Sequence, residues 1–409
     1  MRARRLNGRK LTIKKLLVWL SIALLALGVG RGYEALTSDL PTLQSSQASL
    51  AELPAEDVII AWPNVGEAAF GTTSSGVLAT SSEIEVIKPI ASIAKIVTAL
   101  AILQEKPISL GEPGAVLTLD STDVGYYNSY HAKGGSVARV TAGEQLTQYE
   151  ALEALLIPSA NNIADSLVRW TFGSMEAYKT YANNMVKGFG LNKTVVDDAS
   201  GFSSSTVSTP SELIILGQKA LQNPVIAEIV AKKEAVIPVA GTIKNVNSLL
   251  SDSKVIGIKT GTTDEAGGCL LFASKYVFDD GNGVTVIGVV LGTPSPVAAF
   301  QSSRALLETV YKGFSKQEVV KAGTIVGSYT SEWGQVTDLV AKDTLVAYRW
   351  RGTPLQPLLL ISKASAPLVA NQTIGQIELS DSLGDSSVTV ITKDAVPKPS
   401  NFWRLRHLF

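Results

Sequence analysis

A serine and a lysine three residues apart, Ser92 and Lys95, form the first group in the chain that could carry out nucleophilic chemistry. The apolar segment IVTALAIL follows them, which predicts a buried helix with both side chains on one face of its first turn. A lysine amine in apolar surroundings loses affinity for its proton and can act as a base. The free amide groups at the start of a helix also stabilise an oxyanion. The pair therefore predicts a serine nucleophile that is activated without histidine.

The same spacing occurs at Ser251 and Lys254, within the polar segment NSLLSDSKV. We expect an exposed loop there, where the lysine keeps its proton in water. Spacing alone is therefore a weak signal, and this second pair receives no catalytic assignment.

A second polar group, Ser159 and Asn161, follows Pro158 in the tract LLIPSANNIAD. A hydroxyl and an amide on one side of a short turn could relay a proton and bind a backbone carbonyl. The simpler interpretation makes Ser159 the N-cap of a helix that starts behind Pro158. Taken by itself, the tract favours the cap, because capping serines are common.

The third group, Lys259, Thr260, Gly261 and Thr262, closes the apolar strand VIGI. Gly261 removes side-chain bulk, so an extended peptide can approach the strand edge. Lys259 and the threonine hydroxyls suit a substrate carboxylate. The alternative is a solvated strand end with a turn glycine.

The elements that must position these groups include both helices and strands. Apolar periodicity predicts helices over 92–105, 148–172, 174–187 and 210–221, and strands over 255–261, 267–278 and 284–292. The segment DDGNG joins the last two strands, which predicts an antiparallel hairpin. We therefore expect an α+β fold in which helices flank an antiparallel sheet. Residues 317–392 consist of short β-rich runs and predict a small all-β domain without helices.

The composition excludes several classes of function. The chain has 409 residues with 36 Lys+Arg and 36 Asp+Glu, and this balance gives no case for a nucleic-acid partner. The single cysteine, Cys269, excludes an internal disulfide and a cysteine metal cage, and its apolar neighbours favour a packing role. The two histidines, His131 and His407, lie far apart in the sequence. We therefore expect no metal centre and no cofactor.

The N-terminal part, residues 1–35, predicts a membrane signal or anchor. Its first fifteen residues carry seven positive charges and no acid: Arg2, Arg4, Arg5, Arg9, Lys10, Lys14 and Lys15. The apolar run over residues 16–30 is shorter than a comfortable bilayer span, which favours a cleaved signal, but no A-x-A site follows, which favours retention. Both alternatives stay open. In either case the positive-inside rule directs the rest of the chain out of the cytoplasm.

Two further segments flank the predicted folded domains, one near each end of the chain. Residues 36–56 are polar, contain two prolines and predict a linker. Residues 393–409 predict an amphipathic C-terminal tail, in which Phe402, Trp403 and Leu405 alternate with Arg404 and Arg406. Such a mixture suits a membrane interface, and the alternative is packing against the last domain.

The three polar groups form a specific combination, S-x-x-K, S-x-N and K-T-G in that order. With them the chain resembles the D-alanyl-D-alanine carboxypeptidases, the low-molecular-weight penicillin-binding proteins that trim peptidoglycan stem peptides. The likeness covers residues 57–314, through KPIASIAKIVTALAIL, TAGEQLTQYEALEALLIPSANNIA, DDASGFSSSTVSTPSEL and GIKTGTTDEAGGCLLFAS. It implies a penicillin-binding/β-lactamase-like fold over this range, followed by the small β domain.

The resemblance implies the catalytic roles. Ser92 would be the acylated nucleophile and Lys95 its proton acceptor. Ser159 would relay the proton to the leaving amine, and Asn161 would bind the substrate backbone. The amide groups of Ser92 and Thr262 would form the oxyanion hole.

The resemblance also implies how the substrate is bound. Lys259 and Thr260 would hold the terminal carboxylate, beside Gly261 and Thr262. Many relatives place an Arg shortly before the helix that corresponds to SSRALLETVYKGF, whereas the preceding SPVAAFQ has none and Arg304 lies too late. Carboxylate binding would therefore rest on the lysine and the threonines.

The implied substrate is a peptidoglycan stem peptide ending in D-Ala-D-Ala, and the implied inhibitors are β-lactams. The implied location is the extracytoplasmic face of the bacterial cytoplasmic membrane. A D,D-endopeptidase would use the same groups. A β-lactamase needs a deacylating Glu, which KGFGLN at 187–192 lacks, although Glu212 could be considered. The non-enzymatic alternative is an envelope scaffold with remnant motifs.

Overall fold

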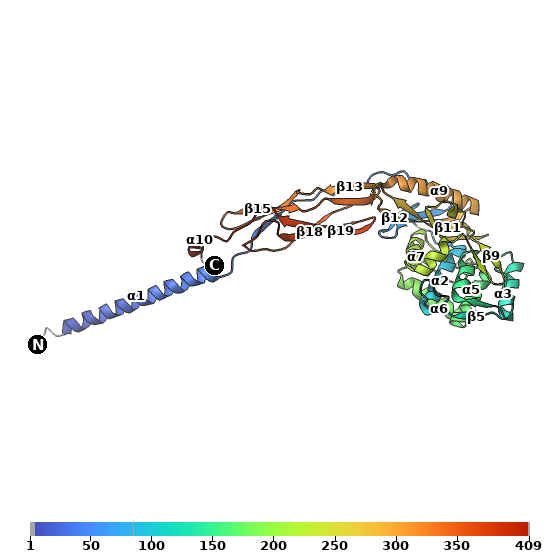
Figure 1. Ribbon diagram of the computed structural model, residues 1–409, viewed down its shortest axis with the longest axis horizontal. Coiled ribbons are helices and arrows are strands. Elements are labelled where there is room, and N and C mark those ends of the chain that lie inside the picture. Colours follow the sequence, from blue (N-terminus) through green and yellow to red (C-terminus); the bar gives the residue numbers. More distant parts are fainter. Residues whose placement is uncertain (1–4, 85, 408–409) are drawn as a thin grey trace.

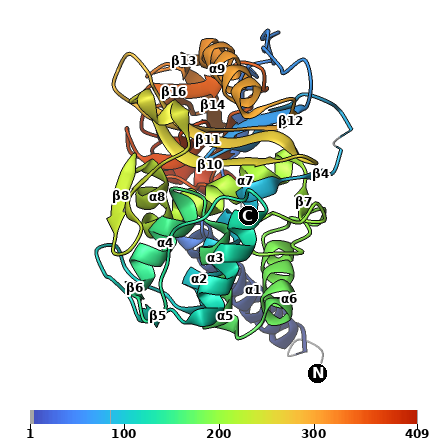
Figure 2. The same cartoon turned by 90° about the vertical axis from the view of Figure 1, so that its right-hand side faces the viewer.

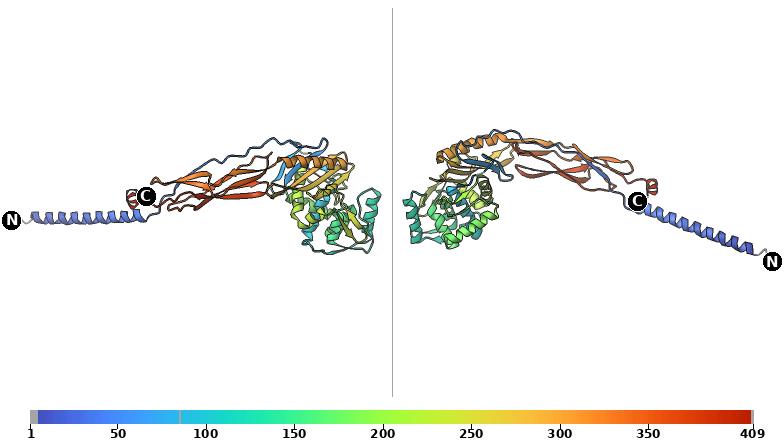
Figure 3. Two further views of the ribbon diagram at one scale, coloured as in Figure 1. Left: turned by 45° about the horizontal axis from the view of Figure 1, so that its top comes forward. Right: turned by 180° about the vertical axis from the view of Figure 1, so that it is seen from behind.

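The computed structural model describes residues 5–407 apart from residue 85, so Arg2 and Arg4 of the basic start and Phe409 of the tail lie outside the described residues. The molecule is elongated (Figure 1), with helix α1 (Arg5–Thr37) at one end and a β unit in the middle. A unit of helices and a sheet forms the other end. Both views in Figure 3 show the same order along the long axis. The candidate catalytic groups all belong to the end unit that is far from α1.

Helix α2 (Ala94–Glu105) is the central helix of that end unit, and a 3₁₀ turn, η1 (Ala91–Ile93), leads into it. Every residue from Ala94 to Leu103 is buried, because the helix is apolar on nearly every side. Figure 2 shows α2 among the other helices. They are α3 (Ser121–Ala132), α4 (Gln148–Leu156), α5 (Asn161–Phe172), α6 (Met175–Gly188), α7 (Pro210–Gln222) and α8 (Pro224–Ala231).

A five-stranded antiparallel sheet packs beside these helices in the order β10-β11-β12-β2-β3. Its strands are β2 (Glu67–Thr72), β3 (Gly76–Thr80), β10 (Val255–Thr263), β11 (Gly267–Val277) and β12 (Gly283–Thr293). Helix α7 covers one face, and α9 (Pro296–Gly313) covers the other. Since strand residues alternate between faces, Ile287 joins the core under α7, whereas Val286 joins the core under α9. Strand β10 lies at the sheet edge, next to η1.

The expected α+β arrangement is confirmed, and the segment DDGNG does join β11 and β12 in a hairpin. Helix α3 is not among the predicted helices, because STDVGYYNSYHA has no apolar period. A capping box made by Asp120 and Asp123 starts it, and this was its one local sign in the sequence. Three short strand pairs complete the unit: β4 (Lys88–Pro89) with β7 (Val207–Ser208), β5 (Val116–Thr118) with β6 (Gln145–Thr147), and β8 (Glu234–Ile237) with β9 (Gly241–Lys244).

The β unit contains a six-stranded sheet in the order β1-β14-β15-β19-β18-β17, together with the pair β13 and β16. The strands are β1 (Gln44–Gln47), β13 (Phe314–Val320), β14 (Ile325–Thr330), β15 (Val336–Ala341), β16 (Leu345–Trp350), β17 (Leu358–Ile361), β18 (Thr373–Asp381) and β19 (Gly384–Thr392). The described residues 317–392 contain no helix. This matches the β-rich sequence pattern of that range.

Residues 36–56, which the sequence predicts to be a linker, contribute to this sheet. Strand β1 pairs antiparallel with β14 and places Ser46 opposite Ser328. Further along, Leu53 forms an isolated bridge with Leu355. All four residues of β1 are exposed, so no alternation of polar and apolar residues marks the strand in the sequence. The segment is therefore held along the β unit by backbone pairing.

Helix α1 and the short helix α10 (Asn401–Arg406) contact each other at the end of the β unit (Figure 1). The Nε of Arg404 donates to the Ala35 carbonyl at 2.9 Å, and its guanidinium also donates to the Ser38 carbonyl. Ala35 is buried at this contact. The helix continues past the apolar run, so residues 13–37 are long and apolar enough to cross a membrane, unlike the run of 16–30 considered alone.

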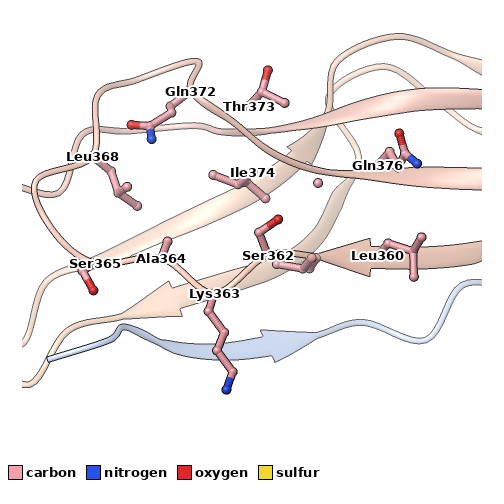
Figure 4. A pocket seen from close by; sticks show the side chains of 12 residues that line it. Leu360, Ser362, Lys363, Ala364, Ser365, Leu368, Gln372, Thr373, Ile374 and Gln376 are labelled. Carbon is pink, nitrogen blue, oxygen red and sulfur yellow. The ribbon is translucent and has the colours of Figure 1, made fainter.

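A cavity of about 580 Å³ lies in the β unit, between β17, β18 and the segment that joins them. Figure 4 shows its aliphatic, hydroxyl and amide side chains, among them Leu368, Ile374 and Gln372. Of the residues that line it, Lys363 alone carries a charge. This cavity is separate from the catalytic groups, which lie in the end unit.

Candidate active site

Ser92 and Lys95 lie side by side at the start of the central helix. Ser92 belongs to η1 and Lys95 to the first turn of α2, with the Lys95 Nζ 2.8 Å from the Ser92 Oγ. The structure thus brings the two residues together at the expected place. Ser251 and Lys254, with the same spacing, are exposed, but only Lys254 lies on the expected loop: Ser251 ends the 3₁₀ turn η2 (Ser248–Ser251), where its hydroxyl donates to the Ser248 carbonyl at 2.9 Å.

The Lys95 amine is fully buried and has two further partners. Its Nζ donates to the Asn161 Oδ1 at 2.6 Å and to the Ser200 carbonyl at 2.8 Å. Burial, followed by the nearby Lys259 ammonium, holds the pKa of Lys95 well below its usual value. Both oxygens are acceptors, so they take the two hydrogens of a neutral amine. In the neutral form the lone pair would be left for the Ser92 hydroxyl, which is the arrangement expected of a base beside a nucleophile.

Ser159 lies in the tight turn between α4 and α5. Its backbone is in the left-handed region, at φ 67°, and helix α5 begins after it with Ala160 at the N-cap and no side-chain cap. Ser159 is therefore not the helix cap that the tract taken alone favours. Its Oγ is buried, lines the cavity beside Ser92 and has no hydrogen-bond partner among the described residues. The hydroxyl is free to bond a group that enters the cavity.

Strand β10 brings the third group to the site. The Lys259 side chain is buried, its Nζ donates to the Thr260 carbonyl at 3.1 Å, and burial lowers its pKa to about 7. A β-carbon on Gly261 would lie 2.9 Å from the Ser92 amide nitrogen and 3.0 Å from the Ile90 carbonyl oxygen. The sequence suggested that this glycine admits a substrate strand. In the structure the lack of a side chain at Gly261 lets β10 pack closely against the segment that carries Ser92.

Two cavities meet at Ser92, which lines both. The first, of about 220 Å³, also contains Ser159, Thr260 and Thr262, and its far side is apolar: Val246, Leu270, Pro296, Ala299 and Phe300. The second, of about 320 Å³, contains Asn161 and Thr262, and its rim is charged: Lys133, Asp264 and Glu265. An extended peptide can therefore lie along β10 with Ser92 at its middle and a different environment on each side.

Two loops of the site were not found from the sequence. Residues 133–136 line the polar cavity, and Gly135 packs so closely that a β-carbon there would lie 2.9 Å from the Asn161 amide nitrogen. In the other loop, Asp198 accepts the backbone N–H of Ser200 at 3.2 Å and of Phe202 at 2.8 Å, which holds the Ser200 carbonyl toward Lys95. The pairs Gly-Gly and Ser-Gly are turn signals that could have indicated both loops.

Two residues considered from the sequence lie outside the cavities. Glu212 on α7 accepts the Lys193 N–H at 2.8 Å and the Thr194 hydroxyl at 2.5 Å, so its carboxylate is engaged in holding a loop. Arg304 is exposed on α9 and lines neither cavity. The geometry therefore gives no support to Glu212 as a deacylating base or to Arg304 as a carboxylate ligand.

Comparison with known proteins supports the same interpretation. Residues 69–295 match the family described as D-alanyl-D-alanine carboxypeptidase. The chain is 30% identical over 221 residues to the D-alanyl-D-alanine carboxypeptidase of Streptomyces sp. strain K15, covering 50% of this chain and 72% of that protein. It is 26% identical over 213 residues to the D-alanyl-D-alanine endopeptidase of Pseudomonas aeruginosa, covering 50% of this chain and 66% of that protein.

A solved structure with the same fold is that of the D-alanyl-D-alanine carboxypeptidase DacD from Francisella tularensis. The TM-score is 0.58 at 17% sequence identity, and the match covers 87% of this chain and 97% of that one. At this identity the likeness concerns the fold, a penicillin-binding type of unit followed by a β unit. With the family match extending over more than half of its residues, the chain belongs to the D-alanyl-D-alanine carboxypeptidase family.

Proposed function

We propose that the protein is a serine D-Ala-D-Ala carboxypeptidase that removes the terminal D-Ala of peptidoglycan stem peptides through an acyl-enzyme on Ser92. One observation carries the proposal: the buried Lys95 amine contacts the Ser92 hydroxyl and is fixed by two acceptors, Asn161 and Ser200. This pair lies in the family-matched region of the chain.

Acylation begins when the Ser92 Oγ attacks the carbonyl carbon of the penultimate D-Ala and its proton passes to Lys95. The developing oxyanion is held by the backbone N–H groups of Ser92 and Thr262. The C–N bond then breaks, and the Ser159 hydroxyl donates its proton to the departing amine of the last D-Ala while it takes up the proton that Lys95 accepted from Ser92. The free Ser159 hydroxyl in the cavity supports this relay. Water next attacks the ester, and the shortened peptide leaves.

Substrate binding uses the edge of β10. The stem peptide adds to this edge as an extended strand, with Asn161 on its backbone. Lys259, Thr260 and Thr262 hold the terminal carboxylate, and Gly261 leaves room for the approach. Thr260 and Thr262 line the apolar cavity beside Ser92, which supports carboxylate binding by these hydroxyls.

The test is an intact-mass time course of the full chain in detergent with benzylpenicillin, run beside Ser92→Ala. We expect a one-to-one adduct that persists for many minutes and is missing from the variant. Penicillin consumed while the protein mass stays unchanged would instead identify a β-lactamase. No adduct and no consumption would leave the scaffold alternative.

A D,D-endopeptidase is the second candidate, because the relative from Pseudomonas aeruginosa carries that name. The same Ser92 chemistry would cleave a cross-link instead of releasing free D-Ala. Incubation with a monomeric pentapeptide and with a cross-linked dimer separates the two activities by their products. Faster release of D-Ala from the monomer supports the carboxypeptidase.

We also propose that α1 is retained and anchors the protein at the extracytoplasmic face of the bacterial cytoplasmic membrane. The hydrogen bonds from Arg404 to Ala35 and Ser38 support retention, because cleavage after the apolar run would remove one side of this contact. Exposed Phe402 and Leu405 on α10 support partition into the lipid surface. N-terminal sequencing of the membrane fraction tests retention, and a start after residue 30 would contradict it.

A further inference from the structure

Asp165 is a carboxylate near Lys95 to which the mechanism above gives no role. It lies on α5, one turn after Asn161, and its Oδ2 accepts the Tyr130 hydroxyl of α3 at 3.0 Å. Its other oxygen, Oδ1, is buried and has no hydrogen-bond partner among the described residues. A carboxylate that is only half satisfied lowers stability, so a role outside packing has to be sought for it.

Helix α5 brings Asp165 close to Lys95, because Asn161, one turn before Asp165, accepts a hydrogen bond from the Lys95 Nζ at 2.6 Å. Besides burial, which has the largest effect, three charged groups shift the pKa of Lys95: Lys259 from β10 lowers it, whereas Asp198 from the loop after α6 and, with the smallest effect, Asp165 from α5 raise it. Asp198 is fully hydrogen-bonded, since it also accepts the Thr206 hydroxyl at 2.6 Å. Asp165 is the less satisfied of the two carboxylates.

The surroundings of Asp165 also shift its pKa toward neutral pH. Burial raises its pKa to about 6, against the hydrogen bond from Tyr130, and with a smaller rise from Asp198 and a smaller fall from Lys95. The Tyr130 ring in turn packs edge-to-face on Phe202 at 5.5 Å, and Phe202 lines the polar cavity. The pair of Tyr130 and Asp165 therefore connects α3, α5 and the wall of the site.

We propose that Asp165 is a positioning residue, held by Tyr130, whose negative charge controls how readily Lys95 takes the proton of Ser92. The inference rests on the proposed function, because it needs Lys95 as the base. With Asp165 ionised, Lys95 is a stronger base but keeps a proton up to a higher pH. Removal of the Asp165 charge therefore has two opposite effects on Lys95. Its amine loses its proton at a lower pH, and the neutral amine is then a weaker base.

The test is the second-order rate of Ser92 acylation by benzylpenicillin from pH 4.5 to 9, measured on the full chain in detergent. In Asp165→Asn we expect the acidic limb of the pH–rate profile, where the acylation rate rises with pH, to move to lower pH by about half to one unit. We also expect the plateau at high pH to fall about 2- to 5-fold. Tyr130→Phe keeps the carboxylate but removes its donor, which raises the pKa of Asp165, so its acidic limb should move in the same direction.

The matched control is Asp123→Asn. Asp123 is a buried carboxylate that joins the same two helices, α3 and α5, through Arg169 at 2.6 Å, and it is not among the groups that shift Lys95. It should lower the thermal midpoint and leave the acidic limb in place. If the limb of Asp165→Asn and of Tyr130→Phe coincides with that of the wild type, the inference is wrong. If the wild type itself is not acylated, the proposed carboxypeptidase function is wrong. That result differs from unchanged pH profiles in an active enzyme, which would refute only the role of Asp165.

Discussion

Gly261 and Ser92 approach each other so closely across the sheet edge that a β-carbon on residue 261 would lie 2.9 Å from the Ser92 amide nitrogen. Ser92 is thus positioned by the missing side chain of Gly261 on β10 as well as by its own helical turn. The same approach places the Ser92 N–H next to the strand on which the substrate is expected to lie.

Gly261→Ala should therefore reduce acylation. The added methyl group must displace η1, and a displacement of about 1 Å at reacting groups costs on the order of 100-fold in rate. The measurement is the rate of penicillin labelling at fixed pH. Gly125→Ala is the control, since Gly125 lies in α3 with nothing within 4 Å of its added β-carbon. A labelling rate for Gly261→Ala equal to that of the control would contradict the prediction.

Lys259→Met should raise stability near neutral pH while it reduces acylation. Burial lowers the pKa of Lys259 to about 7, against 10.5 in an exposed lysine, so the unfolded chain binds more protons between these values. The stability of the wild type therefore rises with pH across that window, and below pH 7 this gain is missing. The variant has no such dependence, so its advantage in thermal midpoint should be largest near pH 6–7 and shrink toward pH 10. An advantage that does not change with pH would show that burial does not perturb Lys259.

Ser159→Ala should separate chemistry from folding. The Ser159 hydroxyl has no partner among the described residues, so its removal should leave the thermal midpoint unchanged. Loss of the proton relay should lower acylation about 100-fold or more. Ser166→Ala is the matched control, because its hydroxyl on α5 is also buried without a partner and lines neither cavity. Equal acylation in both variants would remove Ser159 from the mechanism.

Arg404→Ala should release α10 from α1. Arg404 bonds the Ala35 and Ser38 carbonyls, whereas Arg406 lies over the Phe402 ring of its own helix at 4.7 Å. Loss of hydrogen bonds worth about 1 kcal/mol each should accelerate amide exchange in residues 401–406 on the order of 10-fold or more. Hydrogen exchange of the full chain in detergent micelles measures this. Arg406→Ala should exchange as the wild type does, and a matching increase there would contradict the assignment of the contact to Arg404.

The sequence indicates the parts of the fold that depend on local patterns. Helix α2 is apolar all round and is buried as expected, and the hairpin of β11 and β12 follows from its turn residues. Strand β1 could not be predicted, because QSSQ is exposed throughout and pairs through its backbone with a strand more than 270 residues away. Helix α3 has no apolar period either, and apart from its capping box it depends on contacts with α5.

The residues of the site can likewise be divided into those that a local sequence pattern indicates and those that act from distant parts of the chain. Ser92, Lys95 and Lys259 stand in recognisable motifs, because their roles require fixed spacing along one helix or one strand. Asp198 and Asp165 act on Lys95 across space, from a loop and from another helix, and no spacing connects them to it. The roles assigned to the motif residues stay predictions until the acylation experiments are carried out.

The pairing of β1 with β14 also bears on how the protein withstands pulling. The chain runs from α1 through β1 to the end unit, and after the end unit it continues through β13 to β19. Strand β1 and the later strands therefore belong to the same β unit. A force that pulls the end unit away from α1 acts on β1 along its own length. The pairs from Gln44 opposite Thr330 to Gln47 opposite Gly327 are then sheared together instead of unzipped one at a time. The four-residue strand therefore lies on the covalent path between α1 and the end unit, and its pairing with β14 ties that path to the β unit.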